Sequence, residues 1–337
     1  MNPILRALTA TLVVILALGA GSSAPAYKIQ LSQVHETMTR AAMDCLARSQ
    51  GARPANCQLS RAALRSLRTH NDSAYKEAVR WPDNPLRETS IFSGPHALLN
   101  VIGGRCARLL DNSGDSIQQA GLPCRSHYGD LQFFHAMKSS VREPVNVTRE
   151  KILAWAKFAY RVANGEVGPD QNFCGQFTTR SNFDASMVPP DFPYCGTEPS
   201  AWTVGEFFTF SCPTQPVNCN VHPTAARVRA TATGAILHLI QDSYSQSHAR
   251  RTDEPVKNST NVAMPVMECG KPREYFHYNR LTSPTHGTAD NWPELGGTCS
   301  GDREGDDAIT ASAVALYYLQ QRKSADDFVA YLADRVF

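Results

Sequence analysis

The sequence is short of charge, and the charge that it has is nearly balanced. Lysine and arginine total 33, aspartate and glutamate total 31, and charged residues make up 19% of the 337 positions. A nucleic-acid groove built on bulk positive charge is therefore not expected. Runs of alternating apolar and polar residues are also missing, so the sequence predicts no sheet.

Long apolar runs are scarce as well. No segment reaches the roughly 18 consecutive apolar residues that a membrane-spanning helix needs. The run from Leu8 to Ala20 follows Arg6 and leads to Ala24-Pro25-Ala26, a small-x-small cleavage site. This pattern is typical of a secretory signal peptide, so we predict that residues 1–26 are removed and that the protein is secreted or periplasmic.

The chain lacks the CxxC pairs of a zinc ribbon, although it contains ten cysteines. An even number of cysteines in an exported chain predicts disulfide bonds. Connectivity does not follow from sequence, but neighbouring cysteines suggest five loop-closing pairs: Cys45/Cys57, Cys106/Cys124, Cys174/Cys195, Cys212/Cys219 and Cys269/Cys299.

Helical periodicity dominates the remaining chain and predicts an all-α fold for a single domain, residues 27–337. Residues 168–222 lack this period and are rich in Pro, Cys, Phe and Thr, so we expect an irregular, Cys-rich insertion there. The predicted helices are Leu31 to Ser49, Leu59 to Val79, a helix capped by Thr148 and ended by Asn164-Gly165, a helix from near Ala225, Ala308 to Gln321, and Ala325 to Val336.

One stretch, AILHLIQDSYSQSHAR, contains His238-x3-Asp242-x5-His248. On a helix, His238 and Asp242 lie one turn apart on the same face, which is the usual spacing of two metal ligands. His248 could reach the same cleft if the helix ends or bends near Ser245. If the pair is considered alone, the alternative to a metal site is that His238 is a hydrogen-bonded core histidine that makes only a local contact with Asp242.

Other histidines and aspartates extend this set of candidate ligands. Asp83 lies between two prolines, which fix it in a turn. His286 and Asp290 form a second pair at helical spacing. Imidazoles and carboxylates without thiolates suit catalytic Zn²⁺. The candidates are His35, Asp83, His96 or His135, His238, Asp242, His248, His286 and Asp290.

In these motifs the chain resembles the bacterial zinc-dependent phospholipases C and the related secreted single-strand-specific zinc nucleases. The signature of that family is His-x3-Asp-x5-His, followed by His-x3-Glu/Asp and preceded by an early His, an Asp in a turn and a His before a long helix. In this chain, the family order is matched by His238, Asp242 and His248, by His286 and Asp290, and by His35, Asp83 and His135.

The resemblance implies an all-α, zinc phospholipase C/nuclease-like domain with long disulfide-closed loops and three zinc ions. Asp83, His135 and His238 would hold the first ion, with Asp242 bridging, and Asp83 would also orient water as the catalytic base. His248, His286 and Asp290 would hold the second ion. The third would take His35, Asp242 and the amine and carbonyl of Tyr27, although family members usually begin with Trp. His96 fits the family spacing to Asp83 better, while His135 fits its context better.

The activity that the resemblance implies is zinc-dependent hydrolysis of phosphoric esters. We expect a phospholipase C acting on phospholipids at a membrane surface, because the net charge is near neutral. A single-strand-specific nuclease acting on single-stranded nucleic acid is the alternative. A non-enzymatic, disulfide-rich secreted binding protein with structural histidines is the alternative from another class.

Overall fold

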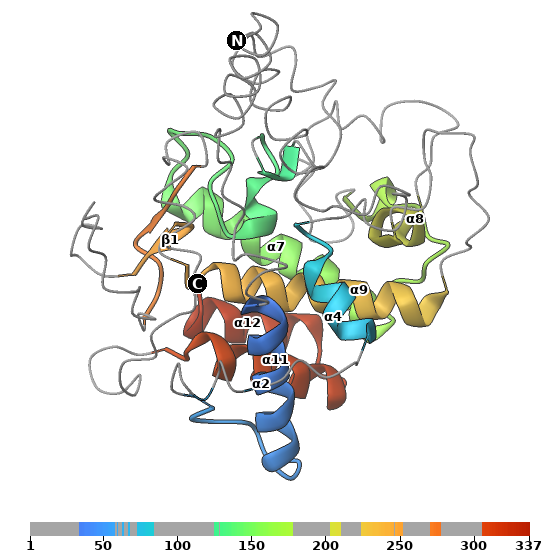
Figure 1. Cartoon of the computed structure of the whole chain (residues 1–337). Helices are drawn as coiled ribbons and strands as arrows, with labels where there is room; N and C mark the ends of the chain where they lie inside the picture. The colour runs from blue at the N-terminus through green and yellow to red at the C-terminus, as the bar shows by residue number, and fades with distance from the viewer. Residues whose placement is uncertain are drawn as a thin grey trace, which may run out of the picture.

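A computed structural model describes residues 34–57, 59, 63, 67, 73–83, 125–127, 129–177, 203–209, 224–245, 247–251, 270–277 and 305–337 (Figure 1). These residues are mostly helical, as the all-α prediction expects. The elements, in chain order, are α2 (Val34–Arg48), α4 (Ser73–Arg80), η2 (Gln132–His135), α7 (Val145–Asn164), η3 (Cys174–Phe177), α8 (Val204–Thr209), α9 (Ala225–Asp242), β1 (Ala249–Arg250), β2 (Glu274–Tyr275), α11 (Ala308–Gln320) and α12 (Ala325–Arg335).

Helix α9 is the centre of the fold and runs through the middle of the molecule (Figure 1). Every residue from Thr231 to Asp242 is buried. A helix that is covered on all sides belongs to the core, and α2, α4, α7, α8 and α11 all pack against α9. The helix begins as predicted: the Thr224 side chain caps it by accepting a hydrogen bond from the Arg227 backbone N–H.

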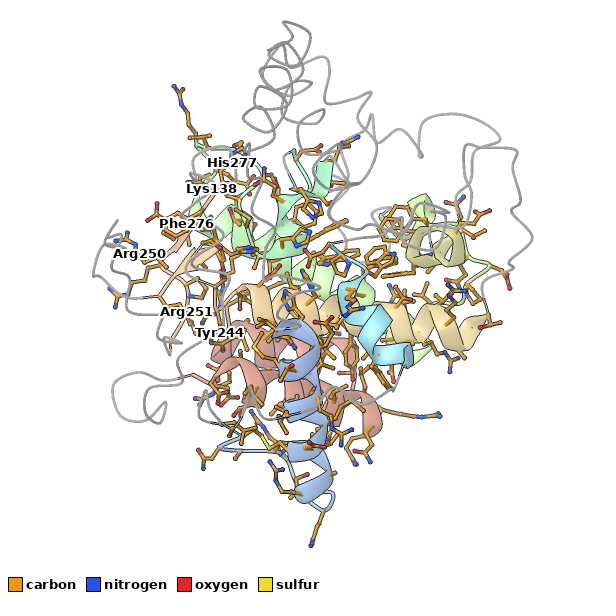
Figure 2. The ribbon with its side chains drawn as sticks, viewed as in Figure 1. Lys138, Tyr244, Arg250, Arg251, Phe276 and His277 are labelled. Carbon is orange, nitrogen blue, oxygen red and sulfur yellow. A yellow bond between two sulfur atoms is a disulfide. The ribbon has the colours of Figure 1, made fainter. Side chains whose placement is uncertain are left out.

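The chain turns sharply after α9 ends at Asp242. Arg251 fixes this turn, because its guanidinium donates hydrogen bonds to Ser243 O (3.1 Å), to Ser243 Oγ (2.8 Å) and to Val336 O (2.8 Å). It also stacks on the Tyr244 ring, 3.8 Å from the centroid (Figure 2). The helix end thus lies three residues before Ser245, which meets the condition under which His248 could reach the same cleft, and the turn returns His248 toward Asp242 (3.6 Å).

Helix α7 begins earlier than the sequence predicted. Its first residue is Val145 and its cap is Pro144, so Thr148 is not the cap but lies within the first turn. The Thr148 hydroxyl donates to Glu143 Oε1 (2.9 Å). The predicted end is confirmed: Gly165 adopts the left-handed conformation (φ 82°) that glycine permits.

The C-terminal helices α11 and α12 match their predicted bounds within one residue. The sulfur atoms of Cys45 and Cys57 lie 1.97 Å apart, at disulfide distance, as that pairing predicts. The other four predicted pairs include cysteines outside the described residues. The two-residue strands β1 and β2 pair antiparallel, which no pattern in the sequence indicated. No helix in the described part of the chain has the length and apolar character to cross a membrane.

The predicted irregular segment contains ordered structure in its described part. Helix α8 lies within it, and the Val204 backbone N–H donates to Gln171 O (2.8 Å), which holds the start of α8 beside the first residues of the segment. Phe207 and Phe208 of α8 pack against the rings of Trp81 and Trp155. Helix α8 thus covers Trp81, two residues before Asp83.

Candidate metal centre

Six of the predicted ligands converge at the buried end of α9. His35 lies on α2, Asp83 follows α4, His135 ends η2, and the others lie on or just after α9. Side-chain exposure is 3% or less for every member of this set. The six residues are His35, Asp83, His135, His238, Asp242 and His248.

Asp242 is the hub of the cluster because both of its oxygens face histidines. Its Oδ2 lies 3.0 Å from His135 Nδ1, 3.0 Å from His238 Nε2 and 3.6 Å from His248 Nδ1. Its Oδ1 lies 3.3 Å from His35 Nε2. A carboxylate that faces ring nitrogens with two different oxygens can bridge two cations.

Asp83 forms a second side of the same cluster. Its Oδ1 lies 3.4 Å from His238 Nε2 and 3.7 Å from His135 Nδ1. Two triads therefore have ligand atoms within 4.8 Å of one another: His35, His238 and Asp242, and Asp83, His135 and His238. These separations allow either triad to hold a metal ion.

Three of the rings have their orientation set by hydrogen bonds made outside these triads. His35 Nδ1 lies 2.7 Å from Gln241 Oε1, and His238 Nδ1 lies 2.9 Å from Val79 O. His248 Nδ1 lies 2.6 Å from His135 O. Each oxygen is an acceptor, so each Nδ1 carries the hydrogen and donates it. Nε2 is then the ligand atom, which is how metal-binding histidines are usually held.

Several buried polar atoms in the cluster lack a hydrogen bond among the described residues. They are Asp83 Oδ2, Asp242 Oδ1 and His135 Nε2. A buried polar group without a hydrogen bond costs about 1–3 kcal/mol, and a charged group costs more. Cations bound between the carboxylates and imidazoles would remove part of this cost, so the donor set fits metal ions.

Without a metal, the buried carboxylates of the cluster form ion pairs with the neighbouring histidines. Burial raises the pKa of Asp242, but the positive charges of His238 and His248 outweigh it and lower that pKa well below its usual value. Burial likewise raises the pKa of Asp83, and the charges of nearby histidines, His238 first, lower it overall. Both carboxylates are therefore anions at neutral pH and available to a metal.

Close packing of α4 against α9 brings Asp83 to the cluster. Gly234 makes this possible, because a Cβ at that position would overlap the Ala78 backbone and lie 2.5 Å from Val79 N. An ion pair between Arg80 of α4 and Glu36 of α2 joins the helices next to His35. Since both partners are buried, the pair restricts how α2 and α4 can move apart.

His135 lies in the cluster. Its alternative, His96, lies outside the described residues, as do Tyr27, His286 and Asp290, so the structure does not decide between His135 and His96. The roles of His286, Asp290 and the Tyr27 amine as metal ligands thus remain predictions.

Two neighbours of the cluster were not selected from the sequence. His127 Nε2 lies 3.9 Å from Asp83 Oδ1, and Gln241 bonds His35. A signal for Gln241 exists: it is an uncharged polar residue in the apolar run beside Asp242. No comparable pattern marks His127.

No family model matches this chain, and neither a curated protein nor a solved structure matches it. The site must therefore be interpreted from its own geometry. The described residues establish a buried His/Asp cluster that could hold metal, without fixing which metal or how many ions.

Gln241→Leu is expected to weaken metal binding about tenfold to a hundredfold, the usual effect of losing a residue that orients a ligand. Leucine cannot accept the hydrogen of His35 Nδ1, so the ring loses its fixed orientation. Competition with a chromophoric chelator would measure the affinity. Thr39→Val is the matched control, because it removes only the hydroxyl at the other end of the Gln241 amide (3.0 Å). Equal affinities for wild type and Gln241→Leu would contradict this role.

Proposed function

We propose that the protein is a zinc-dependent phosphodiester hydrolase of the phospholipase C type. The observation that carries this proposal is the cluster in which Asp83 and Asp242 meet four buried histidines. A set of nitrogen and oxygen donors without thiolates suits zinc in a catalytic role. Three ions are proposed from the family resemblance, with His286, Asp290 and the Tyr27 amine completing the sites.

In the proposed reaction, the metal and the protein side chains have different roles. Zinc bound at the cluster would lower the pKa of a water molecule toward about 7 and neutralise negative charge on phosphorus. Asp83 is assigned as the base that orients the water, because its Oδ2 is buried and makes no hydrogen bond within the described residues. The surrounding helices exclude bulk water, which strengthens these interactions.

A phospholipid substrate is favoured over single-stranded nucleic acid by the aromatic residues near the site. Nucleases that bind single strands stack bases on accessible rings. The described aromatic candidates are at most 8% exposed and pack into the core instead: Trp81, Phe133, Phe134, Phe207 and Phe208. We also propose export and removal of residues 1–26, which would free the Tyr27 amine as a ligand.

The test uses the full processed protein, purified without chelator. Elemental analysis is expected to find zinc, and the zinc protein is expected to hydrolyse phosphatidylcholine and release phosphocholine. Cleavage of single-stranded DNA without lipid turnover would replace the phospholipase assignment with the nuclease. Zinc near zero, with stability unchanged by chelator, would instead favour the non-enzymatic binding protein.

Zinc binding is expected to release protons and to strengthen as pH rises. Burial lowers the pKa of His238, but the charges of Asp242 and Asp83 outweigh it and hold that pKa well above its usual value. In the metal-free protein the protonated ring therefore stabilises the fold fully below the unfolded pKa, about 6.5. This contribution is lost as pH rises through the raised value. Because a histidine ligand must be neutral, the proton has to leave before the metal binds.

Calorimetry of zinc binding in buffers of different ionisation enthalpy would measure this release. Heats that do not depend on the buffer, with an affinity that is constant from pH 6 to pH 8, would contradict the prediction.

A further inference from the structure

The turn that follows α9 carries two of the clustered candidate ligands, one at each end. Asp242 is the last residue of α9, and His248 lies six positions further along the chain. Helix α9 does not end on a left-handed residue, because its cap, Ser243, keeps a right-handed helical conformation (φ −62°, ψ −15°). The carbonyl groups at this helix end therefore need hydrogen-bond donors from elsewhere in the chain.

Arg251 supplies such donors from beyond His248. Its guanidinium donates to Ser243 O (3.1 Å) and to Ser243 Oγ (2.8 Å), so it closes residues 243–251 into a loop. The planar fork of an arginine fixes this geometry better than a lysine can. A cation at the C-terminal end of a helix is also favoured by the helix dipole. The side chain therefore links the residue next to Asp242 to the chain just after His248.

Arg251 is itself held by three other segments of the fold. Its Nη1 donates to Val336 O (2.8 Å), just after α12, and to Gly270 O. The Tyr244 ring lies against the guanidinium, 3.8 Å from it (Figure 2), and the Tyr244 hydroxyl donates to Asp306 O. Only 5% of Arg251 is exposed. A buried side chain with this many bonds has little freedom to move, so it keeps the two ends of the turn at a fixed separation.

The turn held in this way places His248 against the hub of the cluster. Ser245 N donates to Asp242 O (2.9 Å), and His248 N donates to Ser245 O (3.0 Å). His248 Nδ1 then lies 3.6 Å from Asp242 Oδ2 and 2.6 Å from His135 O. Among the described residues, His248 belongs to neither of the two triads whose ligand atoms lie within 4.8 Å of one another. Its place in the cluster therefore depends on the turn and not on α9 itself.

We propose that Arg251 is a positioning residue of the metal centre: it holds His248 at the distance from Asp242 that a bound zinc ion needs. Its guanidinium always carries its proton, so it does not bind the ion itself. This inference rests on the proposed function in one respect, because it assumes zinc at the cluster. The effect of Arg251 should therefore appear in zinc binding and should act through His248.

The experiment measures the zinc affinity of the full processed protein by competition with a chromophoric chelator. Arg251→Met keeps much of the apolar stem and removes every donor, so its zinc affinity is expected to fall about tenfold to a hundredfold, the usual effect of losing a residue that orients a ligand. Arg251→Lys keeps the charge with a single donor group and should fall less. In the His248→Ala protein, which retains both triads, adding Arg251→Met should change the affinity by less than about threefold, because the ligand through which it acts is gone.

Two other arginines provide controls for this measurement. Arg149 Nη2 also donates to a backbone carbonyl near the end of α12, Ala333 O (2.6 Å), but from α7 and not from the turn. Arg149→Met should therefore lower the free energy of unfolding and leave zinc affinity unchanged. Arg250→Met removes the neighbouring ion pair with Glu274 (2.9 Å) and should also keep the wild-type affinity. Denaturant unfolding in excess chelator measures the stability of every variant apart from its metal binding.

The outcomes separate this inference from the proposed function. Wild-type zinc affinity in Arg251→Met would overturn the inference, and so would an equal loss in the His248→Ala background or in Arg149→Met. If Arg251→Met does not fold, Arg251→Lys decides, and wild-type affinity in that variant would overturn the inference. A wild type that binds zinc but hydrolyses no phosphodiester would overturn the proposed function and leave this inference standing. A wild type that binds no zinc would overturn both.

Discussion

Asp242→Asn is expected to abolish zinc binding and phosphodiester hydrolysis together. The carboxylate is a member of one candidate triad and faces His135 and His238 of the other, with ring nitrogens of His35, His135 and His238 at 3.0–3.3 Å. Losing a residue that only orients a ligand costs about tenfold to a hundredfold in affinity, so losing Asp242, a candidate ligand that contacts both triads, should cost more than about a hundredfold. Elemental analysis and a kcat/KM measurement on phosphatidylcholine would check both effects.

The same variant should also destabilise the metal-free protein at neutral pH. The lowered pKa of Asp242 means that its charge stabilises the fold above the unfolded pKa, near 3.8. This stabilisation is lost as pH falls through the lowered value. Removing one partner from a buried ion pair costs about 3–5 kcal/mol. Denaturant unfolding in excess chelator would measure the loss apart from any metal effect.

Asp307→Asn is the matched control for Asp242→Asn. Asp307 is also a buried aspartate, but it caps α11 by accepting hydrogen bonds from Ile309 N (2.9 Å) and Thr310 N (3.1 Å). Burial raises its pKa, and asparagine caps helices about as well as aspartate. Full zinc content and an unfolding free energy within about 1 kcal/mol of wild type are expected. Retention of zinc and activity by Asp242→Asn would remove Asp242 from the centre of the site.

Gly234→Ala is expected to destabilise the protein by about 2 kcal/mol or more, although alanine is the better helix former by about 1 kcal/mol. The added methyl group would overlap the backbone of Ala78 and Val79, which cannot move aside as a flexible side chain can. Helix α4 must shift, and with it both Val79 O, which orients His238, and Asp83. Zinc affinity should therefore fall together with stability.

Denaturant unfolding with and without zinc would measure the effect of Gly234→Ala. The matched control is Gly168→Ala, because a Cβ at Gly168 meets nothing within 4 Å. That change should lie within about 0.5 kcal/mol of wild type. A Gly234→Ala protein that is more stable than wild type would mean that α4 and α9 do not approach as closely as described.

Local patterns in the sequence were enough to predict much of the described secondary structure. The start of α9 near Ala225 was predicted, and the end of α7 follows from Asn164-Gly165. The prediction failed at two elements whose local signals were misleading or weak. Thr148 looks like a cap, but the helix begins at Val145 because the preceding Pro144 already has the extended conformation of a cap residue. Helix α8 was missed because it is short and lies in a segment without helical period.

The sequence by itself determined the ligand chemistry and the pairing of His238 with Asp242, because residues four apart share one face of any helix. Only the tertiary structure decided that His35, Asp83 and His135 meet that pair, and that Gln241 and His127 flank it. Gln241 is the neighbour of Asp242, and the other four lie 107 to 207 positions away from it, yet nothing local encodes which of them will touch. That choice depends on how closely α2 and α4 pack on α9, which the missing side chain of Gly234 and the buried Arg80–Glu36 ion pair set.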